Sequence, residues 1–226
     1  MTRRFVGSRR GYPIAGLLGG IVSSTNVTFL FARASRDELA SCTPLALGVA
    51  GASAVMCVRV LVATAVLNPA AARVLLPYLI GPFLAAALVA WWGIRKYKEP
   101  ALNEPAPSNP LQFASALQMA ILFQVVLFVV SWAQGTWGQA GVFLSAGVLG
   151  LTDVDALVVS LAKNAGSQLP IAMAARAIAI GVLTNTLLKL SIGALIGAEG
   201  FRRTAVLGLS AVAIACVISI VGLTET

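Results

Sequence analysis

The stretch "GLTDVDALVVS", from Gly150 to Ser160, places two carboxylates two residues apart in a segment that is otherwise almost entirely apolar. A glycine, a threonine and two aspartates partway along an apolar segment predict that its helix is interrupted there. The meaning of such an interruption depends on whether the surrounding chain lies in water or in a membrane.

The composition indicates a membrane. Hydrophobic residues make up 58% of the 226 residues and charged residues only 11%, whereas a soluble domain carries about 25% charged residues. A helix needs about 20 apolar residues to cross the hydrocarbon core of a bilayer. Uncharged runs, several of them long enough, recur at Pro44–Val58, Val74–Ile94, Leu111–Thr152, Ala177–Leu188 and Thr204–Leu223. We therefore expect an all-α, multi-pass integral membrane protein surrounded by lipid.

The apolar runs predict five spanning helices and two less regular segments. The interruptions are "GGIVSST" in the first irregular segment and "GLTDVD" in the second. The predicted spans are 44–67, 73–94, 111–133, 171–197 and 203–223, and the irregular segments are 13–35 and 139–165. Prolines and charges of both signs in "RKYKEPALNEPAPSNP" predict an exposed linker. We divide the chain into a first membrane half (1–97), the linker (98–110) and a second membrane half (111–226).

The two halves show a weak internal repeat. An offset of 130 residues aligns glycine with glycine and base with base at five positions: Gly20/Gly150, Arg33/Lys163, Gly51/Gly181, Arg59/Lys189 and Arg73/Arg203. Internal duplication is a common way to build transporters. The second half has a full span, 111–133, ahead of its irregular segment and the first half does not. We therefore expect that an N-terminal helix is missing, or that a second copy or another chain supplies it.

The distribution of lysine and arginine favours irregular segments that enter the membrane and turn back. If both turn back, eleven basic residues lie on one side and two, Arg73 and Lys163, on the other; if both cross, the split is seven against six. Cytoplasmic loops are enriched in lysine and arginine, so the uneven split is preferred. The two halves then have opposite orientations.

Composition also excludes several classes of function. The chain has no histidine and three scattered cysteines, which excludes a Cys/His zinc site and Ser-His or Cys-His catalysis. We predict no enzyme activity and no cofactor. The net charge of +8 is explained by basic membrane-surface loops, and no soluble segment is long enough for a nucleic-acid-binding domain.

The two aspartates have a structural interpretation. A helix that restarts inside the membrane exposes backbone N–H groups that need acceptors, and aspartate at the N-cap or first turn supplies them. The offset of 130 pairs Asp153 with Ser23 and Asp155 with Thr25, and serine and threonine also cap helices. The two bases deep in their spans, Arg59 and Lys189, could in turn hold the carbonyl ends of the broken helices.

Four stretches resemble a known family: "GLLGGIVSSTNVTFLFARASR", "SAVMCVRVLVATAVLNP", "NPLQFASALQMA" and "GLTDVDALVVSLAK". They are similar to the uncharacterised membrane domain, domain of unknown function 4010, found in MgtC/SapB-type proteins. The similarity covers nearly the whole chain, but the N-terminal MgtC/SapB portion and the family's first helix are absent. The resemblance implies a bacterial inner-membrane protein linked to magnesium or other cations, and it supplies no established activity.

Two hypotheses for function follow. In the first, the protein is a transporter or channel for a small cation, such as Mg²⁺ or another metal ion, or is coupled to protons. Its mid-membrane site would use oxygen ligands, and burial favours the protonated form of a carboxylate that carries protons. The candidate ligands are Asp153 and Asp155, which would hold a metal ion, with Thr152, Ser23, Thr25 and Asn185. Lys189 and Arg59 are the charge partners. In the second, a non-transporting regulatory subunit acts through helix packing at Gly16-x-x-x-Gly20 and Gly193-x-x-x-Gly197.

Overall fold

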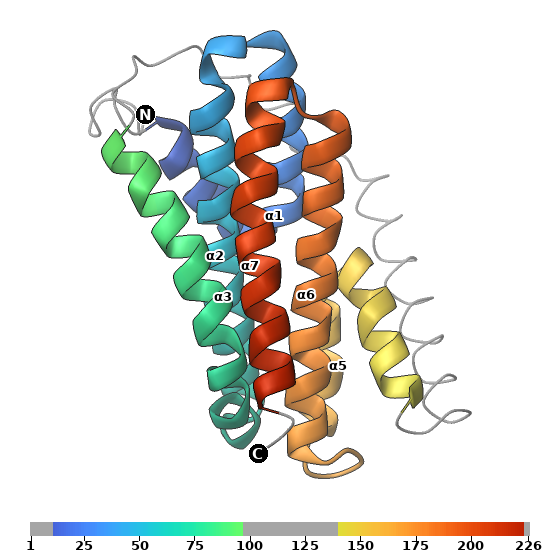
Figure 1. Cartoon of the computed structure of the whole chain (residues 1–226). Helices are drawn as coiled ribbons and strands as arrows, with labels where there is room; N and C mark the ends of the chain where they lie inside the picture. The colour runs from blue at the N-terminus through green and yellow to red at the C-terminus, as the bar shows by residue number, and fades with distance from the viewer. Residues whose placement is uncertain (1–10, 97–139, 224–226) are drawn as a thin grey trace.

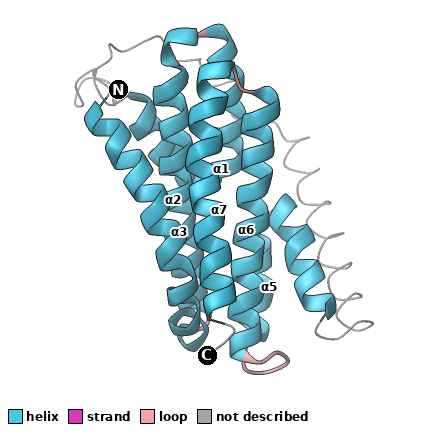
Figure 2. Ribbon diagram, viewed as in Figure 1, coloured by secondary structure: helices cyan, strands magenta, loops and turns pink. Residues whose placement is uncertain are grey.

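A computed structural model describes residues 11–96 and 140–223, nearly all of which are helical (Figure 2). The predicted linker and the predicted span 111–133 lie outside the described residues. The elements, in chain order, are α1 (Gly11–Asp37), the 3-10 turn η2 (Leu39–Ser41), α2 (Cys42–Leu67), α3 (Pro69–Lys96), the helix Ala140–Thr152, α5 (Val154–Asn164), α6 (Ile171–Ile196) and α7 (Glu199–Gly222).

Five of the described helices are long and apolar enough to cross a bilayer: α1, α2 with η2, α3, α6 and α7. The predicted spans 44–67, 73–94, 171–197 and 203–223 correspond to α2, α3, α6 and α7. Large apolar side chains cover the outer surface of these helices, as at Leu195 and Leu207. The expectation of an all-α, multi-pass membrane protein is therefore confirmed.

Although α1 is long enough to cross, it folds back on itself. The backbone of Ser23 is extended (φ −160°, ψ 110°) and divides α1 into two helical arms. At the ends of these arms, the Tyr12 hydroxyl donates a hydrogen bond of 2.8 Å to the Glu38 carboxylate. Residues 26 positions apart in a straight helix would be separated by about 39 Å. Both ends of α1 therefore lie at the same end of the bundle, with Ser23 at the tip between them.

The second predicted interruption is also present. Asp153 has an extended backbone (φ −151°, ψ 103°) between the helix Ala140–Thr152 and α5. The end of α5 lies beside the α2–α3 connection, where the Asn68 amide donates to the Ala165 carbonyl at 2.8 Å. In Figure 1, the α5–α6 connection and the α1–α2 connection lie at opposite ends of the bundle. The two broken segments thus enter the bundle from opposite ends.

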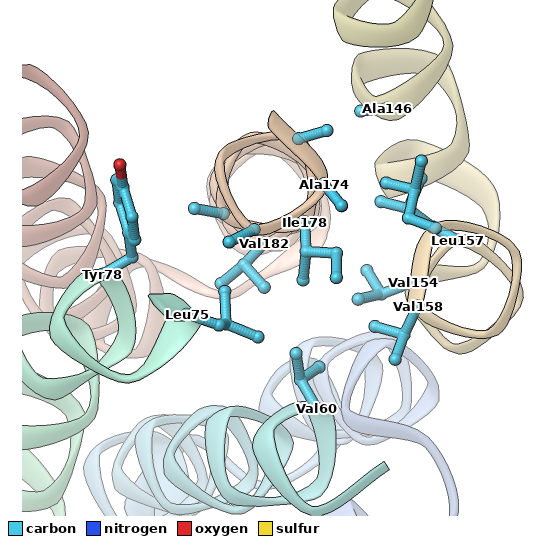
Figure 3. Packing of buried hydrophobic residues seen from close by; sticks show 14 of the residues in the cluster. Val60, Leu75, Tyr78, Ala146, Val154, Leu157, Val158, Ala174, Ile178 and Val182 are labelled. Carbon is cyan, nitrogen blue, oxygen red and sulfur yellow. The ribbon is translucent and has the colours of Figure 1, made fainter. Parts of the chain in front are cut away.

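The core around the second broken segment is apolar. Side chains of α2, α3, α5 and α6 interdigitate there, as Figure 3 shows for Val60, Leu75, Val158 and Ile178. These residues are at most 1% exposed. Tight packing of this kind fixes the position of α5 against the long helices.

Close helix approach depends on glycine at matching places in the two segments. A Cβ atom on Gly16 would lie 2.6 Å from the Gly48 Cα, and one on Gly150 would lie 2.8 Å from the Gly181 Cα. Each glycine therefore lets a broken segment lie directly on the long helix that follows it.

The fold-back of α1 predicts that Tyr12 and Glu38 can be cross-linked. In a variant whose three cysteines, Cys42, Cys57 and Cys216, are replaced by serine, Tyr12→Cys with Glu38→Cys should be joined by a short bifunctional thiol reagent, which spans the space left by the two original side chains. The pair Pro69→Cys with Arg95→Cys, at the same sequence separation within α3, is the matched control and should not. Cross-linking of neither pair would contradict the fold-back.

Candidate functional site

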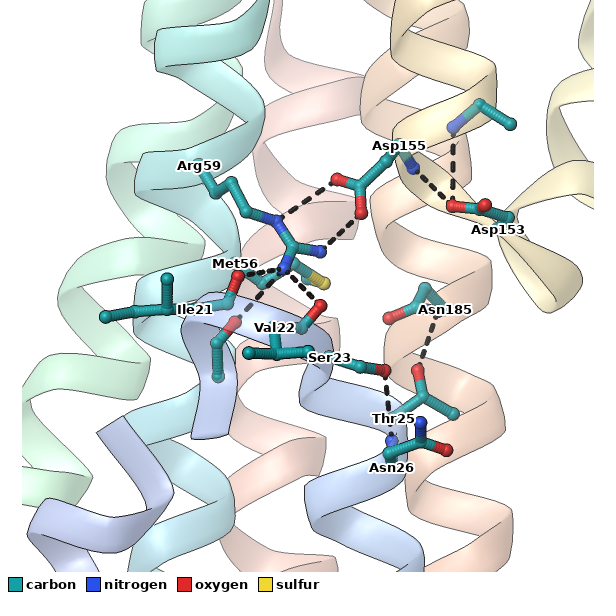
Figure 4. A network of polar contacts seen from close by, with 12 residues as sticks. Ile21, Val22, Ser23, Thr25, Asn26, Met56, Arg59, Asp153, Asp155 and Asn185 are labelled. Atoms are coloured by element: carbon teal, nitrogen blue, oxygen red, sulfur yellow. Dashed lines mark hydrogen bonds and ion pairs between the residues drawn. The ribbon is translucent and has the colours of Figure 1, made fainter. Parts of the chain in front are cut away.

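The tips of the two broken segments meet in the middle of the bundle. Figure 4 shows the tip of α1 facing the start of α5, with Arg59 from α2 and Asn185 from α6 beside them. The polar side chains at this crossing bind one another and the free backbone groups at the two helix breaks. The site is built from two interrupted helices and the two long helices that hold them.

Arg59 is the central connection. Its Nη1 donates to the carbonyl oxygens of Gly20 (3.2 Å), Ile21 (2.7 Å) and Val22 (2.9 Å), the last carbonyls of the first arm of α1. Its Nε and Nη2 donate to the Oδ1 and Oδ2 atoms of Asp155 at 3.1 and 2.6 Å. The final carbonyls of a helix lack intrahelical partners and carry partial negative charge. Arg59 satisfies them and forms a two-point ion pair with the other segment.

The two aspartates have different roles. Oδ1 of Asp153 accepts from the backbone N–H groups of Asp155 (2.9 Å) and Ala156 (3.3 Å), so Asp153 is the N-cap of α5. Ser23 has the corresponding position in α1, where its Oγ accepts from the N–H of Asn26 at 3.3 Å. The capping interpretation therefore describes Asp153 and Ser23. Asp155 is different, because both of its oxygens bind Arg59.

Asn185 joins the two tips. Its Nδ2 donates to the Gly150 carbonyl at 3.0 Å and to the Thr25 hydroxyl at 3.3 Å. The residue is 4% exposed, and its Oδ1 has no hydrogen-bond partner among the described residues. Asn185 thus holds a carbonyl near the end of the helix Ala140–Thr152, as Arg59 holds the carbonyl end of the first arm of α1. An unpartnered buried carbonyl oxygen is also an available acceptor.

Lys189, which aligns with Arg59 at the offset of 130, makes a different contact. It is fully buried, and its Nζ lies 3.0 Å from the Met56 Sδ. Within residues 11–96 and 140–223, no ion pair connects Lys189 to a carboxylate. The predicted pairing of Lys189 with an aspartate is therefore not observed there. We also expected Lys189 to bind the carbonyl end of a broken helix, and Asn185 makes that contact instead. The contact with Met56 had no signal in the sequence.

Thr152 lies apart from this network. Its hydroxyl donates to the Leu149 carbonyl of its own helix at 3.1 Å. The described part of the chain contains no group of three or more His, Cys, Asp or Glu side chains arranged to hold a metal ion. Of the predicted ligands, the structure brings together Asp155, Asn185, Thr25 and the capping residues Ser23 and Asp153. A cation that takes the place of Arg59 on both carboxylate oxygens of Asp155 requires Arg59 to move.

These features define the class of protein: a multi-pass, all-helical membrane protein in which two broken segments meet at a polar crossing. The chain belongs to the family described as Domain of unknown function (DUF4010), whose model matches residues 1–197. An uncharacterized protein of Aquifex aeolicus (strain VF5) is 22% identical over 194 residues, which cover 84% of each chain. No solved structure matches the chain.

The capping role of Asp153 predicts a specific ranking of substitutions. Asp153→Ala should lower the free energy of unfolding by about 1 kcal/mol, whereas Asp153→Asn should change it by a few tenths, because asparagine caps as well as aspartate. Ser23→Ala and Ser23→Asn are the matched pair in α1 and should behave in the same way. Unfolding in mixed detergent micelles measures all four. Equal destabilisation by alanine and asparagine at Asp153 would contradict the assignment.

Proposed function

We propose that this protein moves a small cation across a membrane and binds it where the two helix breaks meet. One observation carries the proposal: an ion pair and a buried amide lie at the tips of segments that enter the bundle from opposite ends. Ionisable groups inside apolar helices are costly and mark ion or proton pathways. Interrupted helices whose ends face a central site are a recurring design in transporters.

The internal repeat also supports a transport function. The offset of 130 pairs Ser23 with Asp153, and both residues have extended backbones and cap the helix that follows. We propose that 1–97 and 111–226 are related halves of opposite orientation, as in transporters built from inverted repeats. A mid-membrane site between such halves can open to one side of the membrane and then to the other.

Roles follow from the contacts. Asp155 is the charged ligand or proton carrier. Asn185 is the neutral ligand, through an Oδ1 atom that has no hydrogen-bond partner in the described part of the chain. Asp153 holds α5 in place as its cap. The Asp155 side chain is 48% exposed, and a carboxylate facing hydrocarbon at this depth is costly. Its exposed part therefore requires water, an ion or a polar partner, as expected for a site on a transport path.

The family resemblance bears on location and cargo. We place the protein in a bacterial inner membrane, and the link to MgtC/SapB-type proteins makes magnesium one cation to assay. We assign it no enzyme activity.

The alternative role, a regulatory subunit acting through its glycine faces, receives less support. Gly16 is covered by α2 of the same chain, and a Cβ on Gly193 would lie 3.5 Å from the Ala205 Cβ of α7. Both glycines are buried within this chain and do not form a free docking face.

Ion flux into proteoliposomes tests the proposal. With dyes for H⁺, Na⁺, K⁺ and Mg²⁺, the wild-type protein should transport at least one cation. Asp155→Asn should lower that flux to below about a tenth of the wild-type rate, since it removes the charge at the site. The matched control is Glu199→Gln, which removes an equal charge from an exposed ion pair at the start of α7, and it should leave the flux unchanged.

Two outcomes would contradict the proposal. The first is no protein-dependent flux of any of these cations. The second is wild-type flux in the double variant Asp153→Asn, Asp155→Asn.

A further inference from the structure

We infer that the guanidinium of Arg59 occupies a binding site for a monovalent metal cation, formed by the carbonyl oxygens of Gly20, Ile21 and Val22 and the carboxylate of Asp155. Arg59 then acts as a tethered competitor that fills the site when the cargo is absent. The inference rests on the proposed function and deepens it, because it names the ligands and the charge of the cargo.

The Arg59 Nη1 atom lies where a bound cation would lie, with three backbone carbonyl oxygens around it. Three carbonyl oxygens lie 2.7 to 3.2 Å from this one nitrogen. Nη1 carries two hydrogens, so at least one of them is shared between two of the three carbonyl oxygens, as is common at helix termini. Three consecutive carbonyl oxygens that converge on one positive centre are also the kind of ligands that a cation-coordination shell needs. Carbonyl oxygens at the ends of broken helices coordinate Na⁺ in transporters.

The charge of the site favours a monovalent ion. The carbonyl oxygens are neutral, so the shell contributes one negative charge, that of Asp155. Asp153, the other carboxylate nearby, is directed at the N–H groups of α5. A monovalent cation balances the single negative charge of the shell itself, because Asp153 is not one of the ligands. Mg²⁺ also keeps several waters and demands near-octahedral geometry, which three adjacent carbonyls of one helix end do not supply.

The site has an open edge through which a metal cation can replace the Arg59 guanidinium. The Arg59 side chain is 26% exposed and that of Asp155 is 48% exposed, so one edge of the site is open, whereas Lys189 on α6 is fully enclosed. Arg59 has a long flexible stem that can swing its head away from the site. Asn185 donates a hydrogen bond to Thr25, two residues beyond the tip of α1. Its Oδ1, which has no hydrogen-bond partner among residues 11–96 and 140–223, offers a further neutral oxygen near the shell.

Removing the tethered cation tests this inference. In Arg59→Gln, the glutamine amide retains a donor for the carbonyl oxygens, but the positive charge is lost. The melting temperature of purified protein in detergent is measured against LiCl, NaCl, KCl, methylguanidinium chloride and MgCl₂, with choline chloride holding the ionic strength constant. We expect at least one alkali cation, and methylguanidinium, to raise the Tm of Arg59→Gln by about 5 °C or more at a hundredfold excess over its Kd.

Matched variants isolate the site. Wild-type protein should respond less, because its own guanidinium competes, and Arg59→Gln with Asp155→Asn should not respond. Arg36→Gln is the control for losing an arginine at a helix end, since Arg36 also donates to two carbonyls, those of Leu195 and Ile196 at the end of α6. It should show no cation-dependent rise beyond that of the wild type.

The contradicting results are equally definite. No cation-dependent rise in Arg59→Gln, an equal rise after Asp155→Asn is added, or a rise with Mg²⁺ alone would overturn the inference. If Arg59→Gln unfolds during purification, recovery of folded protein is compared across the same salts, and failure to recover in every cation also overturns it. Wild-type flux separates the two proposals: flux without a cation response in Arg59→Gln rejects only the tethered competitor, whereas a response without flux rejects the transport role.

Discussion

A helix broken inside an apolar bundle must have its free backbone groups satisfied by other parts of the protein, and the rest of this structure depends on that constraint. Each buried polar group left without a partner costs about 1–3 kcal/mol, and lipid offers no substitute. Arg59 supplies donors to the carbonyls that end the first arm of α1, and Asp153 supplies an acceptor to the N–H groups that start α5. These contacts allow the segments to turn back where an unbroken helix would cross.

The two tips satisfy the same constraint with different charge. Ser23 and Asp153 share a backbone conformation and a capping role, so capping does not require a charged residue. Asp155 is not needed as a cap, and its partner Arg59 is committed to the other broken segment. The negative charge of Asp155, which has no counterpart in the tip of α1, therefore joins the two tips through Arg59. Opening this ion pair would free a carboxylate and a helix end together, which links the interaction that stabilises the fold to the proposed binding of a cation.

Much of this architecture could be predicted from the sequence, because it follows from hydropathy and from the scarcity of polar residues. The spans corresponding to α2, α3, α6 and α7 and both breaks were visible as apolar runs and their interruptions. The contacts of α6 could not be predicted. Asn185 and Lys189 lie one turn apart on the same face of α6, so the position of α6 along its own axis decides which of them reaches a broken helix end. The use of backbone carbonyl oxygens as acceptors, such as those of Gly20 and Val22, cannot be predicted from side-chain identity.

The central claim is that Arg59 and Asp155 hold the two broken segments to each other. A double-mutant cycle tests it most directly, with unfolding free energies measured in mixed micelles for Arg59→Gln, Asp155→Asn and the combined variant. A coupling energy of about 1 kcal/mol or more is expected for a two-point ion pair between these side chains. Additive effects, with a coupling energy near zero, would contradict the claim. Apolar packing and Asn185 would then be what holds the two tips together.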